Sequence, residues 1–166
     1  MLTTTAKLSQ EQFNVLWITL SGYRDIAQRA AIGYSDEGTR VALNKCGLVI
    51  DRLIAAIHPR SDCADTLFTH SEQVAHNDAS EIVRYLFARH VECLEISPAL
   101  EIVEGRYALL YFAKFFKELS DAWQFLDLGN IPQFVSRLTK LQTRCFGEIN
   151  FSNLLASHGL ATIDAA

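Results

Sequence analysis

The sequence predicts an all-α protein, a single compact bundle of five to seven helices around a central aromatic-rich helix. Apolar residues recur at helical spacing through most of the chain, and the alternation typical of strands is nearly absent. Signals for helix starts and stops separate these stretches. The stretch 106–117 is apolar around its whole circumference. It must therefore be covered on nearly every side, as the rod of a helical domain or as part of a subunit interface.

Length and composition indicate one folded domain. The chain has 166 residues, of which 49% are hydrophobic and 20% charged, as expected of a globular protein. Residues 1–166 are predicted to form a single all-helical domain, with 1–8 and 160–166 frayed. The net charge of −4 does not favour nucleic acid as a partner. The sequence has no basic start followed by an apolar run and no window apolar enough to span a membrane, so a cytoplasmic location is expected.

The first two helices have clear boundary signals. Ser9 and Gln12 match a capping box, so the first helix is predicted to start at Ser9 and to end at Gly33. The second is predicted to follow Ser35-Asp36 and to stop at His58-Pro59.

The middle of the chain holds one weak and one strong helical segment. The weaker segment covers 62–75. Asp78 and Glu81 then match a second capping box, and the helix that follows is predicted to end at Ser97-Pro98.

The next helix is predicted to be long. Pro98 suits its first position, with Ser97 as its cap. It contains the aromatic stretch and either runs to Leu128, where Gly129 supplies a left-handed terminator, or breaks near Ser120-Asp121.

Pro132 opens the last predicted helix, which stops by Gly159. Four side chains on the predicted apolar faces are expected to be almost fully buried: Leu53, Phe112, Phe116 and Leu138.

The segment 84–90 holds the sharpest chemical candidate. Arg84 and His90 on one helix resemble the active motif of the HEPN nucleases, all-helical dimers that cleave RNA. The resemblance implies that Arg84 would bind the scissile phosphate and that His90 would transfer a proton near neutral pH, at a dimer interface. Six residues of helix, however, place the two side chains about 120° apart. The alternative is that Arg84 pairs with Glu81 one turn earlier and that His90 is a partly buried polar residue.

A second candidate is a metal site at 70–78. Glu72 and His76 lie four residues apart and share a helix face, where His70 or Asp78 could complete the ligands. The segment lacks the motifs of di-iron bundles and zinc proteases, which favours a solvated helix end. We expect no metal and no cofactor.

The four cysteines contain no Cys-x-x-Cys pair. This pattern favours buried, reduced thiols over a disulfide pair or a metal set. Cys63 is the exception, because it lies in a predicted loop beside charged residues.

Three basic residues form a stripe on the last helix, with spacings of three and four: Arg137, Lys140 and Arg144. The stripe could bind nucleic acid or an acidic partner. A solvated helix face is the simpler interpretation.

The sequence as a whole favours a non-enzymatic helical protein-interaction module, such as an adaptor, an inhibitor or a small regulatory subunit. Its expected surface is apolar and helix-lined: Tyr107, Tyr111, Phe115 and Trp123. A protein partner and a homodimer are expected. The alternatives are a HEPN-like, metal-independent ribonuclease using Arg84 and His90, and a binder of a small apolar ligand or cofactor between helices.

Overall fold

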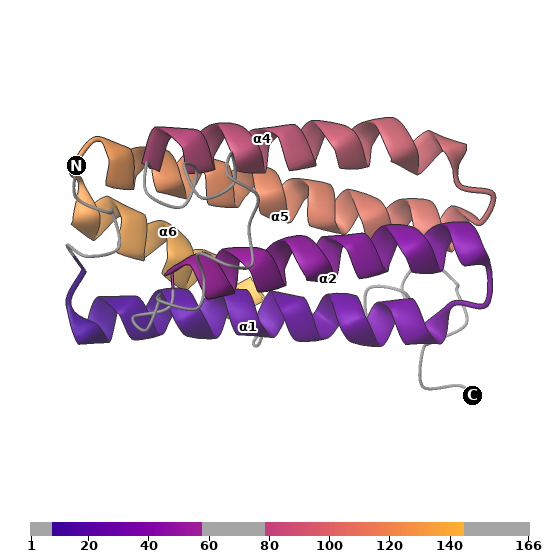
Figure 1. The fold of residues 1–166 in the computed structure, drawn as a ribbon, viewed down its shortest axis with the longest axis horizontal. Coiled ribbons are helices and arrows are strands. Elements are labelled where there is room, and N and C mark those ends of the chain that lie inside the picture. The colour runs from indigo at the N-terminus through magenta and orange to yellow at the C-terminus, as the bar shows by residue number, and fades with distance from the viewer. Residues whose placement is uncertain (1–7, 58–78, 145–166) are drawn as a thin grey trace.

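The helices lie antiparallel to their neighbours along the chain. The computed structural model describes residues 8–57 and 79–144, and within these ranges it contains helices and no strand. The all-α bundle is thereby confirmed, whereas the predicted segment 62–75 lies outside the described residues. In the described part of the chain, four long helices and a shorter fifth form the bundle (Figure 1): α1 (Gln10–Gly33), α2 (Glu37–Ile57), α4 (Ala79–Ile96), α5 (Val103–Asp127) and α6 (Ile131–Thr143).

The start of α1 is fixed by the predicted capping box. The Ser9 hydroxyl accepts from the Gln12 amide, and the Gln12 side chain accepts from the Ser9 amide. The helix ends at Gly33, also as predicted. Before α2, the Asp36 carboxylate accepts from the Thr39 amide at 3.0 Å and from the Thr39 hydroxyl at 2.6 Å. Free amides in the first turns of both helices are thus satisfied by side chains.

The turn between α4 and α5 differs from the prediction. Pro98 does not open α5, which begins at Val103. Ser97–Ala99 instead form a single 3-10 turn, η3, and Leu100 is extended and buried. The chain must reverse direction here because α4 and α5 are antiparallel. The Ser97-Pro98 pair therefore marks a turn and not the start of a helix.

The helix α5 runs unbroken past Ser120-Asp121. Gly129, with φ of 82°, terminates it in the left-handed conformation, as predicted. In α6, Pro132 lies in the first turn, and the Asn130 side chain caps the helix by accepting from the Gln133 amide. The predicted continuation of this helix beyond 144 lies outside the described residues.

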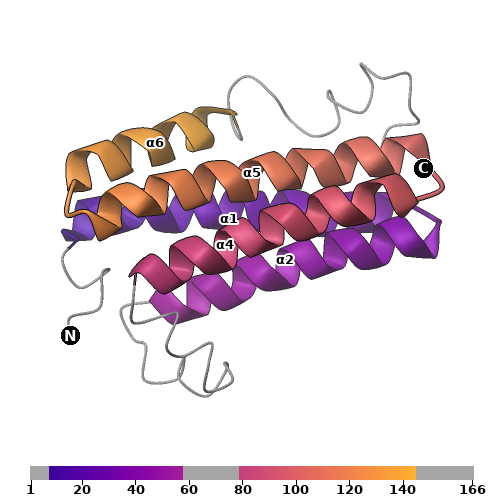
Figure 2. The ribbon, with the colours of Figure 1, turned by 90° about the horizontal axis from the view of Figure 1, so that it is seen from above.

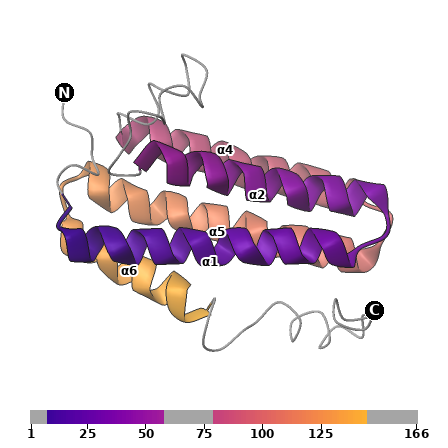
Figure 3. The same cartoon turned by 60° about the horizontal axis from the view of Figure 1, so that its bottom comes forward.

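The buried aromatic residues of α5 lie in the core of the bundle: Phe112, Phe115, Phe116 and Trp123. The four side chains expected there are buried: Leu53, Phe112, Phe116 and Leu138. The Tyr23 ring of α1 stacks on Phe115 with centroids 4.0 Å apart, and its hydroxyl donates to the Leu141 carbonyl at 3.0 Å. Helices α1, α5 and α6 are thereby joined around one aromatic cluster, with α6 beside α1 and α5 (Figure 3).

The start of α5 lies very close to the start of α2. Gly105 faces the buried Thr39, and a Cβ on Gly105 would collide with the Thr39 hydroxyl and lie 2.9 Å from its methyl carbon. Tyr34 donates to the Glu104 carbonyl at 3.3 Å. Burial, followed by the charges of Glu104 and Asp36, raises the pKa of Tyr34 to about 12. The raised pKa keeps the hydroxyl protonated, and able to donate this hydrogen bond, at alkaline pH where an ordinary tyrosine ionises.

Candidate interaction surface

An exposed apolar face lies along α4 and the first half of α5. The two helices run side by side (Figure 2). Five large apolar side chains on this face are between 39% and 48% exposed: Phe87, Leu94, Val103, Tyr107 and Leu110. Their spacings of seven along α4, and of four and three along α5, place them on one side of each helix. We refer to these five residues as the α4–α5 face.

The α4–α5 face is hollowed at the turn between the two helices. An open groove of about 350 Å³ lies there, lined by Leu94, Ser97, Pro98, Val103, Arg106, Tyr107 and Leu110. The Arg106 guanidinium is held in the wall, because its Nε donates to the Leu100 carbonyl at 2.6 Å. The groove is therefore a mainly apolar surface with a fixed cation at its edge.

Exposed charges of both signs border the face. Glu95 and Glu101 are exposed near the turn between α4 and α5, where Arg106 also lines the groove. Lys114 is exposed on α5 one turn after Leu110.

Tyr107 is the one predicted surface residue that belongs to this face. Tyr107 is exposed and Tyr111 is partly buried. Phe115 and Trp123, at 2% and 0% exposure, lie in the core. Placing these two on an interaction surface was wrong, because Phe115 stacks on Tyr23 and the Trp123 ring packs edge-on against Phe134 of α6.

The other four residues of the face were missed from the sequence. Their signal is a second apolar stripe on helices that already have one. In α4, Phe87 and Leu94 flank Val91, whereas Ile82, Leu86 and Cys93 form the buried stripe. A helix with two apolar stripes buries one against the core and leaves the other at the surface.

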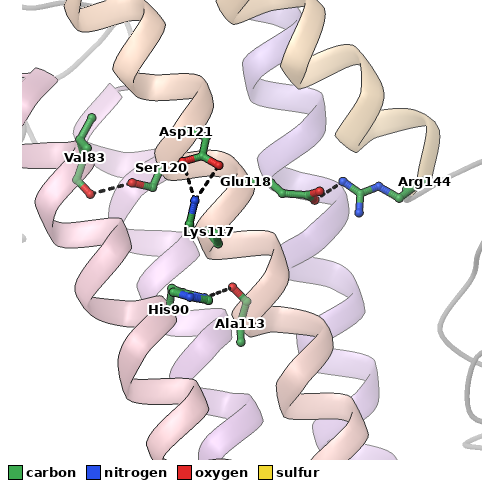
Figure 4. Close-up of polar contacts among 8 residues, drawn as sticks. All are labelled: Val83, His90, Ala113, Lys117, Glu118, Ser120, Asp121 and Arg144. Carbon is green, nitrogen blue, oxygen red and sulfur yellow. Dashed lines mark hydrogen bonds and ion pairs between the residues drawn. The ribbon is translucent and has the colours of Figure 1, made fainter.

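Arg84 and His90 do not converge. The Arg84 guanidinium pairs with Glu81 one turn earlier. The His90 Nδ1 lies 2.8 Å from the Ala113 carbonyl of α5 (Figure 4). The His90 ring also packs against Phe87. Each side chain thus has a partner of its own, as in the alternative that the sequence offered. No contact between them forms the site that the nuclease resemblance implies.

The basic stripe on α6 is partly used inside the bundle. Arg144 pairs with Glu118 of α5 (Figure 4). The Arg137 guanidinium lies over the Phe125 ring, 5.2 Å from its centroid. Lys140 is exposed. Two of the three cations therefore join α6 to α5. This leaves fewer positive charges in the stripe to bind an anionic partner.

The predicted metal-site candidates and Cys63 lie outside the described residues. Within the described ranges, no three His, Cys, Asp or Glu side chains gather as a metal would require. The only thiol pair there is Cys46 with Cys93, which are buried and adjacent.

No family model, curated protein or solved structure matches the chain significantly. Among the described helices, none combines the length and apolarity needed to cross a membrane. Function is therefore inferred from the residues of the chain itself.

Proposed function

We propose that this chain is a non-enzymatic helical protein-interaction module that binds a protein partner through the α4–α5 face. The observation that supports this is the gathering of five half-exposed large apolar side chains on one side of two adjacent helices. Single exposed apolar residues are ordinary, but contiguous patches are associated with interfaces. A tyrosine and a phenylalanine within the face are residue types enriched in interface centres.

A second copy of the chain is the partner that the charges favour. In a two-fold dimer the same face serves both subunits. With the axis across the apolar centre, the exposed Glu95 and Glu101 of one subunit approach Lys114 of the other. The apolar centres then cover one another, and the opposite charges lie at the solvated rim, where they set the orientation more than the affinity.

We expect Leu110→Glu to abolish self-association without unfolding the protein. Leu110 is 39% exposed within the face, so a carboxylate is tolerated in the monomer but would lose its hydration at the interface in the dimer. The dissociation constant of the dimer should rise at least tenfold. Light scattering after gel filtration, over a series of protein concentrations, measures the change.

The matched control is Leu48→Glu, the same change at a 58% exposed leucine of α2 outside the face. It should leave the dimer unchanged. If both variants weaken association equally, or if neither does, the α4–α5 face is not the interface. Circular dichroism of each variant establishes that it is folded.

We also expect no metal-independent cleavage of RNA above a buffer control, including at protein concentrations at which the dimer forms. Arg84 is paired with Glu81, and the His90 ring is held at the Ala113 carbonyl. Cleavage would need the Arg84 guanidinium, to bind the phosphate, and the His90 ring, to transfer the proton, within reach of one phosphate. Cleavage that disappears in a folded His90→Ala variant would replace this proposal with the HEPN-like ribonuclease.

A further inference from the structure

Two cysteines that are distant in the sequence meet between α2 and α4. The Cys46 sulfur of α2 lies 3.9 Å from the Cys93 sulfur of α4. Both thiols are free and buried. The Lys45 ammonium and the Glu92 carboxylate, one residue before each, pair at 3.1 Å across the same two helices. Side chains of α2 and α4 therefore meet at two successive positions of each helix.

The geometry is near that of a cross-link. A disulfide requires two sulfurs about 2.05 Å apart. Sulfurs 3.9 Å apart on two helices can reach that distance through side-chain rotation together with an approach of the two backbones. The two side chains point toward one another, as a disulfide requires.

A small cavity lies beside both sulfurs. Its volume is about 20 Å³, which is space for roughly one water-sized molecule. Leu109 and Phe116 line its inner side, and Lys45, Arg89 and Glu92 line its outer side. The outer residues are polar side chains at the bundle surface, of which Lys45 is about half exposed. Rotation of these side chains would admit a small neutral oxidant, whereas a large thiol reagent would be excluded.

We propose that Cys46 and Cys93 are an oxidative modification site, where a hydroperoxide converts the thiol pair into a disulfide that ties α2 to α4. The thiolate of one cysteine attacks the peroxide oxygen and becomes a sulfenic acid, and the O–O bond breaks to release water or an alcohol. The second thiol attacks the sulfenic sulfur, the S–S bond forms and water leaves. Two thiols are oxidised and one peroxide is reduced. A dithiol restores both thiols by exchange.

The reaction should be slow and the product stable. The hydrogen bond with Cys93 and then burial raise the pKa of the Cys46 thiol, and the charge of Glu92 adds to this while that of Lys45 opposes it. Little Cys46 thiolate is therefore present at neutral pH. Once formed, the disulfide closes a long loop of chain, which restricts the unfolded state.

The test uses the full chain with Cys63→Ser and Cys145→Ser, so that Cys46 and Cys93 are the only thiols left. The protein is treated with hydrogen peroxide, alkylated after denaturation and digested for mass spectrometry. The expected product is a peptide pair linked through Cys46 and Cys93. The oxidised protein should gain roughly 5–15 °C in Tm, and dithiothreitol should reverse both changes.

The control adds Cys93→Ala, which should give neither the linked peptides nor the gain in Tm. Two free thiols after prolonged treatment, sulfinic acids without a link, or a link between two molecules would each overturn the proposal. These outcomes are read in the protein that retains both cysteines, so they do not depend on whether the alanine variant folds.

Discussion

Phe116→Ala is expected to lower the free energy of unfolding by about 3–5 kcal/mol. The side chain is 1% exposed and its ring contacts that of Phe115. It also lines the small cavity beside Cys46 and Cys93. Its removal loses apolar burial and leaves a cavity that rigid neighbouring helices cannot fill. Chemical denaturation monitored by circular dichroism measures the change.

Phe87→Ala is the matched control for Phe116→Ala. Phe87 is 46% exposed on α4, so the same substitution should cost less than about 1 kcal/mol at concentrations where the protein is monomeric. Equal effects at the two positions would mean that Phe116 faces solvent and that the helical phase of α5 is wrong.

Gly105→Ala is expected to destabilise the protein by about 1–3 kcal/mol, although alanine is the better helix former. The new methyl group would collide with Thr39, whose side chain is fully buried and held by the Asp36 carboxylate. Either α5 moves away from α2, or Thr39 loses its hydrogen bond. Thermal or chemical unfolding measures the cost.

Gly47→Ala should have the opposite sign and stabilise the protein by about 0.5–1 kcal/mol. This glycine is also inside a helix, but its added Cβ would lie 3.6 Å from the Ala27 Cβ, an ordinary contact. If both glycine substitutions stabilise the protein, α2 and α5 do not approach as closely at Thr39 as described.

Most helix ends could be predicted because their signals are local. The capping box at Ser9 and the left-handed glycine at 129 act on their own turn of backbone. The start of α5 could not be predicted from Pro98 in the same way. A Ser-Pro pair suits both a helix start and a turn, and the choice depends on the antiparallel packing of two whole helices.

The candidate surface was predicted less well than the fold. The many aromatic residues in one stretch of the sequence favour an interaction surface that includes Phe115 and Trp123. Their number, however, does not tell which side of α5 faces a neighbouring helix. That depends on α1 and α6, which supply Tyr23 and Phe134 to cover these two rings. The stripe of Phe87 and Leu94 could have been read from spacing alone.

The contact of Cys46 with Cys93 could not have been read from the sequence. The two residues belong to different helices, lie 47 positions apart, and no motif links them. Only the tertiary arrangement of α2 and α4 brings the sulfurs together.

Sedimentation equilibrium of the unmodified chain tests the proposed interaction function most directly. The weight-average mass should rise from 18.6 kDa towards twice that value as protein concentration increases, and Leu110→Glu should keep it at the lower value. A mass of 18.6 kDa across the whole concentration range, identical for the unmodified chain and for Leu110→Glu, would contradict self-association through the α4–α5 face.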